Sequence, residues 1–261
     1  MQEDLIQKVS EFEISKKKEL EKLFYEWRKV ITSDKKTVKN GDRGKKLPQD
    51  CFVEDGFFPG YFSKENKYKI LFIGRESRYI RKNYVEQTLA DKGYSSNWWR
   101  RIFYLTYGIQ HEGKVIWSKL PDYQSIIAEM EANNNYGFAV MNISKYSNHS
   151  LYGAKSNYNL INQFLDDSDC DLQKLFNREL SILEPDIIIT TDLWNGKIKR
   201  INELFDDDKF DFWNVYGNNK AAYGRYNKLN CMVIDVYHFA TPFISDRDLF
   251  YNPVMQILFH K

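Results

Sequence analysis

The chain has 261 residues, of which 43% are hydrophobic and 16% aromatic, so it can bury a sizeable core and falls outside the disordered class. Its cysteines, Cys51, Cys170 and Cys231, are isolated, and their spacing argues against a zinc or iron–sulfur site and favours free thiols in a reducing cytoplasm. No apolar stretch reaches about 18 residues and the N-terminus is charged, so we predict a cytoplasmic protein without signal peptide, membrane span, metal or cofactor.

The N-terminal region is unusually basic. An apolar stripe at helical spacing predicts one helix from Asp4 to Ile31, and the polar stretch from Thr32 to Lys46 predicts a loop. The segment from Ser15 to Lys46 holds 12 Lys or Arg against 5 Asp or Glu, although the whole chain carries a formal charge of only +2. Such a segment either approaches phosphates or forms a solvated face, and both readings stay open.

Four short apolar runs follow this region. Runs this short and this apolar are typical of strands that are buried on both faces of a parallel sheet. An aromatic turn over Gly56–Tyr61 leads into the first of them. The predicted strands are Tyr68–Gly74, Gly137–Met141, Asp186–Ile189 and Cys231–Tyr237.

Helical segments separate the predicted strands. Alternating strands and helices indicate right-handed crossovers and a three-layer α/β/α architecture around a short, mainly parallel, four-stranded central sheet. We predict a single domain over residues 1–261, with residues 57–261 as its core and residues 1–48 as an elaboration. The predicted helices are Asn97–Tyr107, Tyr123–Ala132, Leu172–Leu183, a helix from Leu193 capped by Thr191 or Asp192, and a closing helix within Ile244–Phe259.

Polar side chains stand where the predicted strands end. In open parallel sheets ligands bind outside the carboxyl ends of the strands, so we expect Glu76, Asn142 and His238 to converge on one crevice. Glu76 is either a general base or one half of an ion-pair network with Arg75 and Arg78.

The local sequence around Asn142 and around His238 likewise allows two interpretations of each residue. The Asn142 amide offers a donor and an acceptor, which can read an amide-like edge such as that of a pyrimidine, or it pairs with a neighbouring turn. The His238 imidazole either donates to an oxygen that gains negative charge or is a structural side chain. No GxGxxG, P-loop, GxSxG or HExxH motif is present, which disfavours nucleotide-dependent redox, P-loop chemistry and the common hydrolase mechanisms.

The order of these segments resembles the uracil-DNA glycosylase superfamily. That family has a strand followed by a catalytic loop such as G-Q-D-P-Y, a later strand ending in an Asn that reads uracil, and a last strand ending in His. The matching residues, over roughly Phe58 to Pro242, are Gly74-Arg75-Glu76, Val140-Met141-Asn142-Ile143-Ser144-Lys145, Glu184-Pro185-Asp186 and His238.

This resemblance implies a glycosylase-type fold and a flipped uracil or modified base in DNA as the ligand. By the resemblance, Glu76 and His238 are the catalytic residues and Asn142 binds the base. The nucleic-acid backbone would be contacted by Arg75, Ser77, Arg78, Lys145 and Thr241, with Arg100, Arg101 and the aromatic helix beginning at Trp98 as further candidates.

Several alternatives remain beside this reading. The aromatic residue that stacks on the base is one of Phe62, Tyr79 and Tyr84. The protein either excises the base, as a DNA glycosylase, or is a catalytically silent relative that binds nucleic acid, a nucleotide or a protein partner. A hydrolase of a small nucleoside-like ligand is the alternative from another class.

Overall fold

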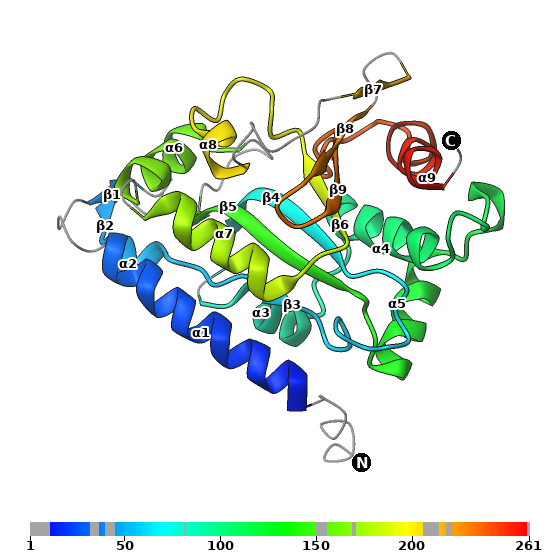
Figure 1. Ribbon diagram of the computed structural model, residues 1–261, viewed down its shortest axis with the longest axis horizontal. Helices are drawn as coiled ribbons and strands as arrows, with labels where there is room; N and C mark the ends of the chain where they lie inside the picture. The colour runs from blue at the N-terminus through cyan, green and yellow to red at the C-terminus, as the bar shows by residue number, and fades with distance from the viewer. Residues whose placement is uncertain are drawn as a thin grey trace.

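The computed structural model describes residues 11–31, 37–39, 45–80, 82–149, 156–168, 171–205, 214–217 and 221–259. Within these residues a seven-stranded sheet with the strand order β3-β5-β4-β6-β9-β8-β7 forms the centre of the molecule (Figure 1). Its strands are β3 Gly56–Phe57, β4 Ile70–Arg78, β5 Phe138–Asn148, β6 Ile187–Thr191, β7 Asn214–Tyr216, β8 Ala221–Tyr226 and β9 Cys231–Val236. A separate antiparallel pair joins β1 Val38–Lys39 to β2 Lys45–Lys46.

The four predicted strands form the inner part of this sheet. β5, β4, β6 and β9 are parallel to one another, but β3 is antiparallel to β5, β8 is antiparallel to β9, and β7 is antiparallel to β8. The sheet is therefore mixed and larger than the predicted four strands. The missed strands, β3, β8 and β7, flank the four inner strands, and two-residue β3 is too short, and β7 too polar and exposed, to give an apolar pattern.

Helices cover both faces of the sheet, because neighbouring residues of each inner strand point to opposite faces. Leu71 and Ile73 of β4 join one buried cluster, whereas Ile70 and Phe72 join the other. The first cluster includes α1, α6, α7 and α8, and the second includes α4, α5 and α9. The molecule thus has the three layers that the sequence predicts.

The N-terminal helix belongs to the first of these layers. Leu20, Leu23, Phe24 and Trp27 of α1 are buried in the cluster beneath it, and Figure 1 shows the helix running alongside α7. The helices are α1 Glu11–Ile31, α2 Pro48–Cys51, α3 Tyr84–Asp91, α4 Asn97–Gln110, α5 Tyr123–Asn133, α6 Tyr158–Asp167, α7 Leu172–Leu183, α8 Ile201–Phe205 and α9 Asn252–Phe259, with single turns η3 Trp117–Lys119 and η5 Arg247–Tyr251.

The two central strands extend well beyond their apolar runs. β4 continues to Arg78 and β5 continues to Asn148, and Gly74 pairs with Asn142 and Glu76 with Ser144 across them. The sequence predicts ends that are too early for both strands, because the residues become polar where β4 and β5 are still paired with each other. Glu76 and Asn142 therefore project from regular strands, which hold them more rigidly than loops would.

The predicted helix from Leu193 is wrong. Within the described part of the chain, the first helix after β6 is α8, and Asp192 has a left-handed backbone with a φ of 55°. The closing region is also divided: a wide π-helical turn, η5, precedes α9. Residues 4–10 of the first predicted helix lie outside the described residues.

Candidate functional site

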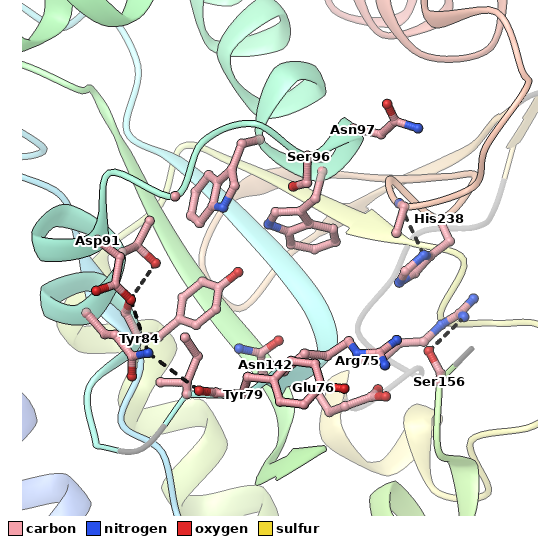
Figure 2. Close-up of a pocket in the computed structure, with 18 residues that line it drawn as sticks. Arg75, Glu76, Tyr79, Tyr84, Asp91, Ser96, Asn97, Asn142, Ser156 and His238 are labelled. Atoms are coloured by element: carbon pink, nitrogen blue, oxygen red, sulfur yellow. Dashed lines mark hydrogen bonds between the residues drawn. The ribbon is translucent and has the colours of Figure 1, made fainter. Parts of the chain in front are cut away.

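A cavity of about 550 Å³ opens at the carboxyl ends of the inner parallel strands. It collects side chains from β4, β5, α3, α4 and the segments before α6 and after β9 (Figure 2). Glu76, Asn142 and His238, which the sequence predicts to converge, all line this cavity. Its lining residues are Arg75, Glu76, Arg78, Tyr79, Ile80, Tyr84, Gln87, Thr88, Asp91, Gly93, Ser96, Asn97, Trp98, Trp99, Asn142, Ser156, His238 and Ala240.

Within the described part of the chain, only one of the two oxygens of the Glu76 carboxylate has hydrogen-bond partners. Its Oε1 accepts hydrogen bonds from the backbone N–H of Asn157 at 3.0 Å and from Nδ2 of Asn148 at 3.2 Å. Its Oε2 is buried and has no partner among the described residues. Burial raises the pKa of Glu76, while these hydrogen bonds and the charges of Arg75 and Arg78 act in the opposite direction. One oxygen is thus fixed, and the other is left to accept a proton.

The orientation of the Asn142 amide is set by Asp55. Asp55 accepts a hydrogen bond from Asn142 Nδ2 at 2.9 Å and another from the Asn142 backbone N–H at 2.7 Å. Because a carboxylate only accepts hydrogen bonds, Nδ2 must face Asp55. Oδ1 faces the other way, toward β4, since a Cβ added to Gly74 would lie 2.8 Å from it.

A buried ion network holds Asp55 in turn. Lys145 Nζ lies 2.5 Å from Asp55 Oδ2 and 2.9 Å from Glu179 Oε2, and all three side chains are almost completely inaccessible to solvent. Lys145, which the sequence predicts to contact a nucleic-acid backbone, is therefore placed in the core and does not line the cavity. Its position supports Asn142 from behind.

His238 is an uncharged imidazole at neutral pH. Burial, together with charge repulsion from Arg75, Arg101 and Arg78, lowers the pKa of His238 to about 3. The backbone N–H of Ala240 donates to Nδ1 at 3.3 Å, so the neutral ring carries its proton on Nε2. His238 is thus a hydrogen-bond donor that does not need to be a cation.

Two arginines of β4 bring positive charge to the cavity. Arg75 forms an ion pair with Asp192 and donates to Ser156 Oγ at 3.2 Å. Arg78 lines the cavity beside the ring of Tyr79, 5.7 Å from its centre. Asp192, predicted as a helix cap, instead anchors Arg75.

The remaining predicted backbone contacts lie outside the cavity. Ser77 is buried in β4, and the carbonyl of Thr241 accepts a hydrogen bond from Arg101 at 2.9 Å. Arg100 and Arg101 both form ion pairs with Asp246 at 2.8 Å, which fixes the segment after His238 against α4.

An aromatic wall completes the cavity. Tyr84 stacks on Trp99, with ring centres 5.8 Å apart, and Trp98 lies 5.8 Å from the His238 ring. Of the predicted stacking residues, Tyr79 and Tyr84 line the cavity, whereas Phe62 packs elsewhere, against Phe57. The role of Asp55 leaves no pattern in the sequence, because nothing near Asp55 indicates that it pairs with a residue 87 positions later.

No protein-family model, curated protein or solved structure matches the chain. None of the helices in the described part is long and apolar enough to cross a membrane. The described residues also contain no group of His, Cys, Asp and Glu side chains arranged to hold a metal ion.

Proposed function

We propose that the protein binds DNA, takes a flipped uracil-type base into the cavity and cleaves its glycosidic bond, as a divergent relative of the uracil-DNA glycosylases with a fold of that type. The observation that carries this proposal is the fixed order of atoms in the Asn142 amide. Oδ1 lies on the β4 side, toward Glu76 and His238, and Nδ2 lies on the opposite side, at Asp55.

This order fits one pyrimidine edge. If the N1 atom of the base lies toward Glu76 and His238, the N3 atom comes next along the ring edge and the substituent on C4 lies beyond it. Uracil presents N3–H to Oδ1 and its O4 to the second hydrogen of Nδ2. Cytosine presents an acceptor to Oδ1 and a donor to Nδ2, so its edge is mismatched.

The groups around the bond to be broken suit hydrolysis. When the bond between N1 and the sugar breaks, its electron pair goes to the base and the sugar becomes cationic. The free Oε2 of Glu76 accepts the proton of the attacking water and stabilises the cation, and Nε2–H of His238 donates to the oxygen of the departing anion. The neutral imidazole suits this role because it is already protonated on the required nitrogen.

The cavity surroundings also suit a base that has left a stack. Arg75 and Arg78 bring positive charge that favours a phosphate backbone. Phe243, in the segment after Ala240, is fully exposed with a φ of 59°, and an exposed apolar side chain can fill the gap left in a duplex.

Release of free base from DNA that contains a single uracil tests the proposed chemistry. We expect Glu76→Gln and His238→Gln each to slow release by about 10²- to 10³-fold, because each removes one interaction made at the breaking bond. Glu112→Gln is the matched control, since this carboxylate lies at the surface beside Lys67.

The outcomes separate the alternatives. Release at the wild-type rate in both cavity variants would contradict the roles of Glu76 and His238. Tight binding of uracil DNA by wild-type protein without release would favour a silent reader. The absence of salt-sensitive DNA binding would overturn both nucleic-acid readings, since phosphate contacts make affinity depend on salt.

A further inference from the structure

The cavity is much larger than a pyrimidine. Its volume is about 550 Å³. Even at the roughly 30 Å³ that one water molecule occupies in the liquid, the non-hydrogen atoms of uracil would fill less than half of it. Figure 2 shows Arg75 and His238 at one end, Asp91 and Tyr84 at the other, and Asn142 between them. A base held by Asn142 therefore leaves one end of the cavity unfilled.

The unfilled end lies beside α3. Helix α3 follows directly on the bridge between Glu54 and Asn83, next to β3, and β3 borders β5 on the side away from β4. This is the side on which Asp55 holds Nδ2 of Asn142. A line drawn from Glu76 and His238 across the Asn142 amide therefore leads to the α3 end of the cavity.

This direction identifies the position on the ring that faces α3. With N1 toward Glu76 and His238, the C4 and C5 atoms of a pyrimidine point away from the breaking bond. The oxygen on C4 is taken by Asn142 in the proposed function. C5 is the remaining position from which a substituent can extend to the α3 end.

The side chains at the α3 end define the chemistry of such a substituent. Tyr84 and Trp99 offer stacked rings, and Gln87 offers an amide next to the carboxylate of Asp91, to which its Nε2 donates at 3.3 Å. The Arg75 guanidinium lies at the other end of the cavity, with His238. A polar or cationic substituent finds partners here, whereas an anionic one meets Asp91.

We infer that the base recognised by this site is a uracil with an amine-bearing chain on C5, which occupies the α3 end of the cavity between Tyr84 and Asp91. This inference rests on the proposed function, because that function sets the direction of the ring. The protein then acts on modified pyrimidines in DNA in preference to plain uracil.

Gly93 allows the α3 end to be closed selectively. It lines the cavity, and a Cβ added to it would meet nothing nearer than the Cβ of Asp91 at 4.0 Å, so a larger side chain has room to enter. Gly93→Phe is the blocking variant. Ala90→Phe is its matched control, because it adds the same ring to an exposed position of α3 that does not line the cavity.

The probes are otherwise identical DNA oligonucleotides with one uracil, one 5-aminoalkyluracil or one 5-carboxyuracil, and equilibrium affinity is the readout. We expect wild-type protein to prefer the aminoalkyl base over uracil by at least about tenfold, which corresponds to about 1.4 kcal/mol, and to discriminate against the carboxyl base. Gly93→Phe should abolish that preference, Asp91→Asn should reduce it, and Ala90→Phe should retain it.

Two results would overturn the inference in distinguishable ways. Equal wild-type affinity for the three bases, unchanged by Gly93→Phe, would show that the α3 end holds no substituent while base recognition stands. Failure to bind any of the three DNAs above the affinity for unmodified DNA would overturn the proposed function, and this inference with it.

Discussion

At the scale of single residues, the site depends on a side chain that does not itself need to touch the base. Asp55 decides which way the Asn142 amide faces, and the ion pair with Lys145 holds Asp55 in place. Asp55 is therefore a positioning residue. An asparagine that could turn over would read uracil and cytosine alike, since exchanging its oxygen and nitrogen exchanges the two edges that it fits.

Asp55→Asn should weaken discrimination between uracil and cytosine. The new amide can donate to Oδ1 of Asn142, so the reversed orientation becomes accessible. We expect the ratio of affinities for uracil and cytosine DNA to fall by at least about tenfold, because a well-aligned pair of hydrogen bonds discriminates by roughly 1–3 kcal/mol.

Asp50→Asn, at an exposed position of α2, is the control for this substitution. A purely structural role for Asp55 predicts that both affinities decline together at an unchanged ratio. That result would contradict the assignment of Asp55 as the residue that orients the amide.

At the scale of elements, the close packing of β4, β5 and α4 sets the geometry of the cavity floor. Gly74 of β4 lies under the Asn142 side chain and under Trp98, and an added Cβ would come within 2.8 Å of Oδ1 and 2.9 Å of the Trp98 ring. Contacts this short force neighbours to move. Position 74 therefore requires a glycine because the side chains of Asn142 and Trp98 come close to its backbone, and not because the chain turns there.

Gly74→Ala should displace both the Asn142 amide and the aromatic wall. We expect it to lower the free energy of unfolding by about 1–3 kcal/mol, as overpacking of a core does, and to weaken uracil binding. Urea denaturation and DNA binding measure the two effects. Gly56→Ala in β3, where the added Cβ makes an ordinary 3.7 Å contact, should change stability far less, and equal losses in both variants would contradict the packing argument.

The sequence predicts the inner strands and the convergence of Glu76, Asn142 and His238 for a physical reason. Apolar runs report burial on both faces of a sheet, and parallel strands bring their carboxyl ends together. Apolar runs do not reveal residues that are buried through ion pairing. Lys145 looks like a solvated loop residue, yet it is buried because Asp55 and Glu179 neutralise it, and such long-range pairing leaves no local pattern.

At the scale of the whole molecule, the ion network of Asp55, Lys145 and Glu179 joins the strand layer to α7 and to the segment before β3. Burial raises the pKa of Glu179 even though Lys145 opposes that shift. Removing the only cation of this trio would leave two carboxylates buried together. The network thus couples the stability of the core to the geometry of the site.

Lys145→Met should destabilise the protein by about 3–5 kcal/mol, the usual effect of breaking a buried ion pair from one side. The midpoint of urea denaturation measures this loss. Lys174→Met is the control, since the Lys174 side chain is 73% exposed and its pair with Asp171 should contribute less than about 1 kcal/mol. A loss no larger than the control's would contradict the supporting role of Lys145.

The measurement that tests the central claim most directly is the affinity of the purified protein for DNA oligonucleotides that differ only in one base, uracil or cytosine, at several salt concentrations. The fixed order of the Asn142 amide predicts at least about tenfold tighter binding of the uracil DNA, with an affinity that falls as salt rises. Equal affinity for the two bases, or a preference for cytosine, would contradict the account.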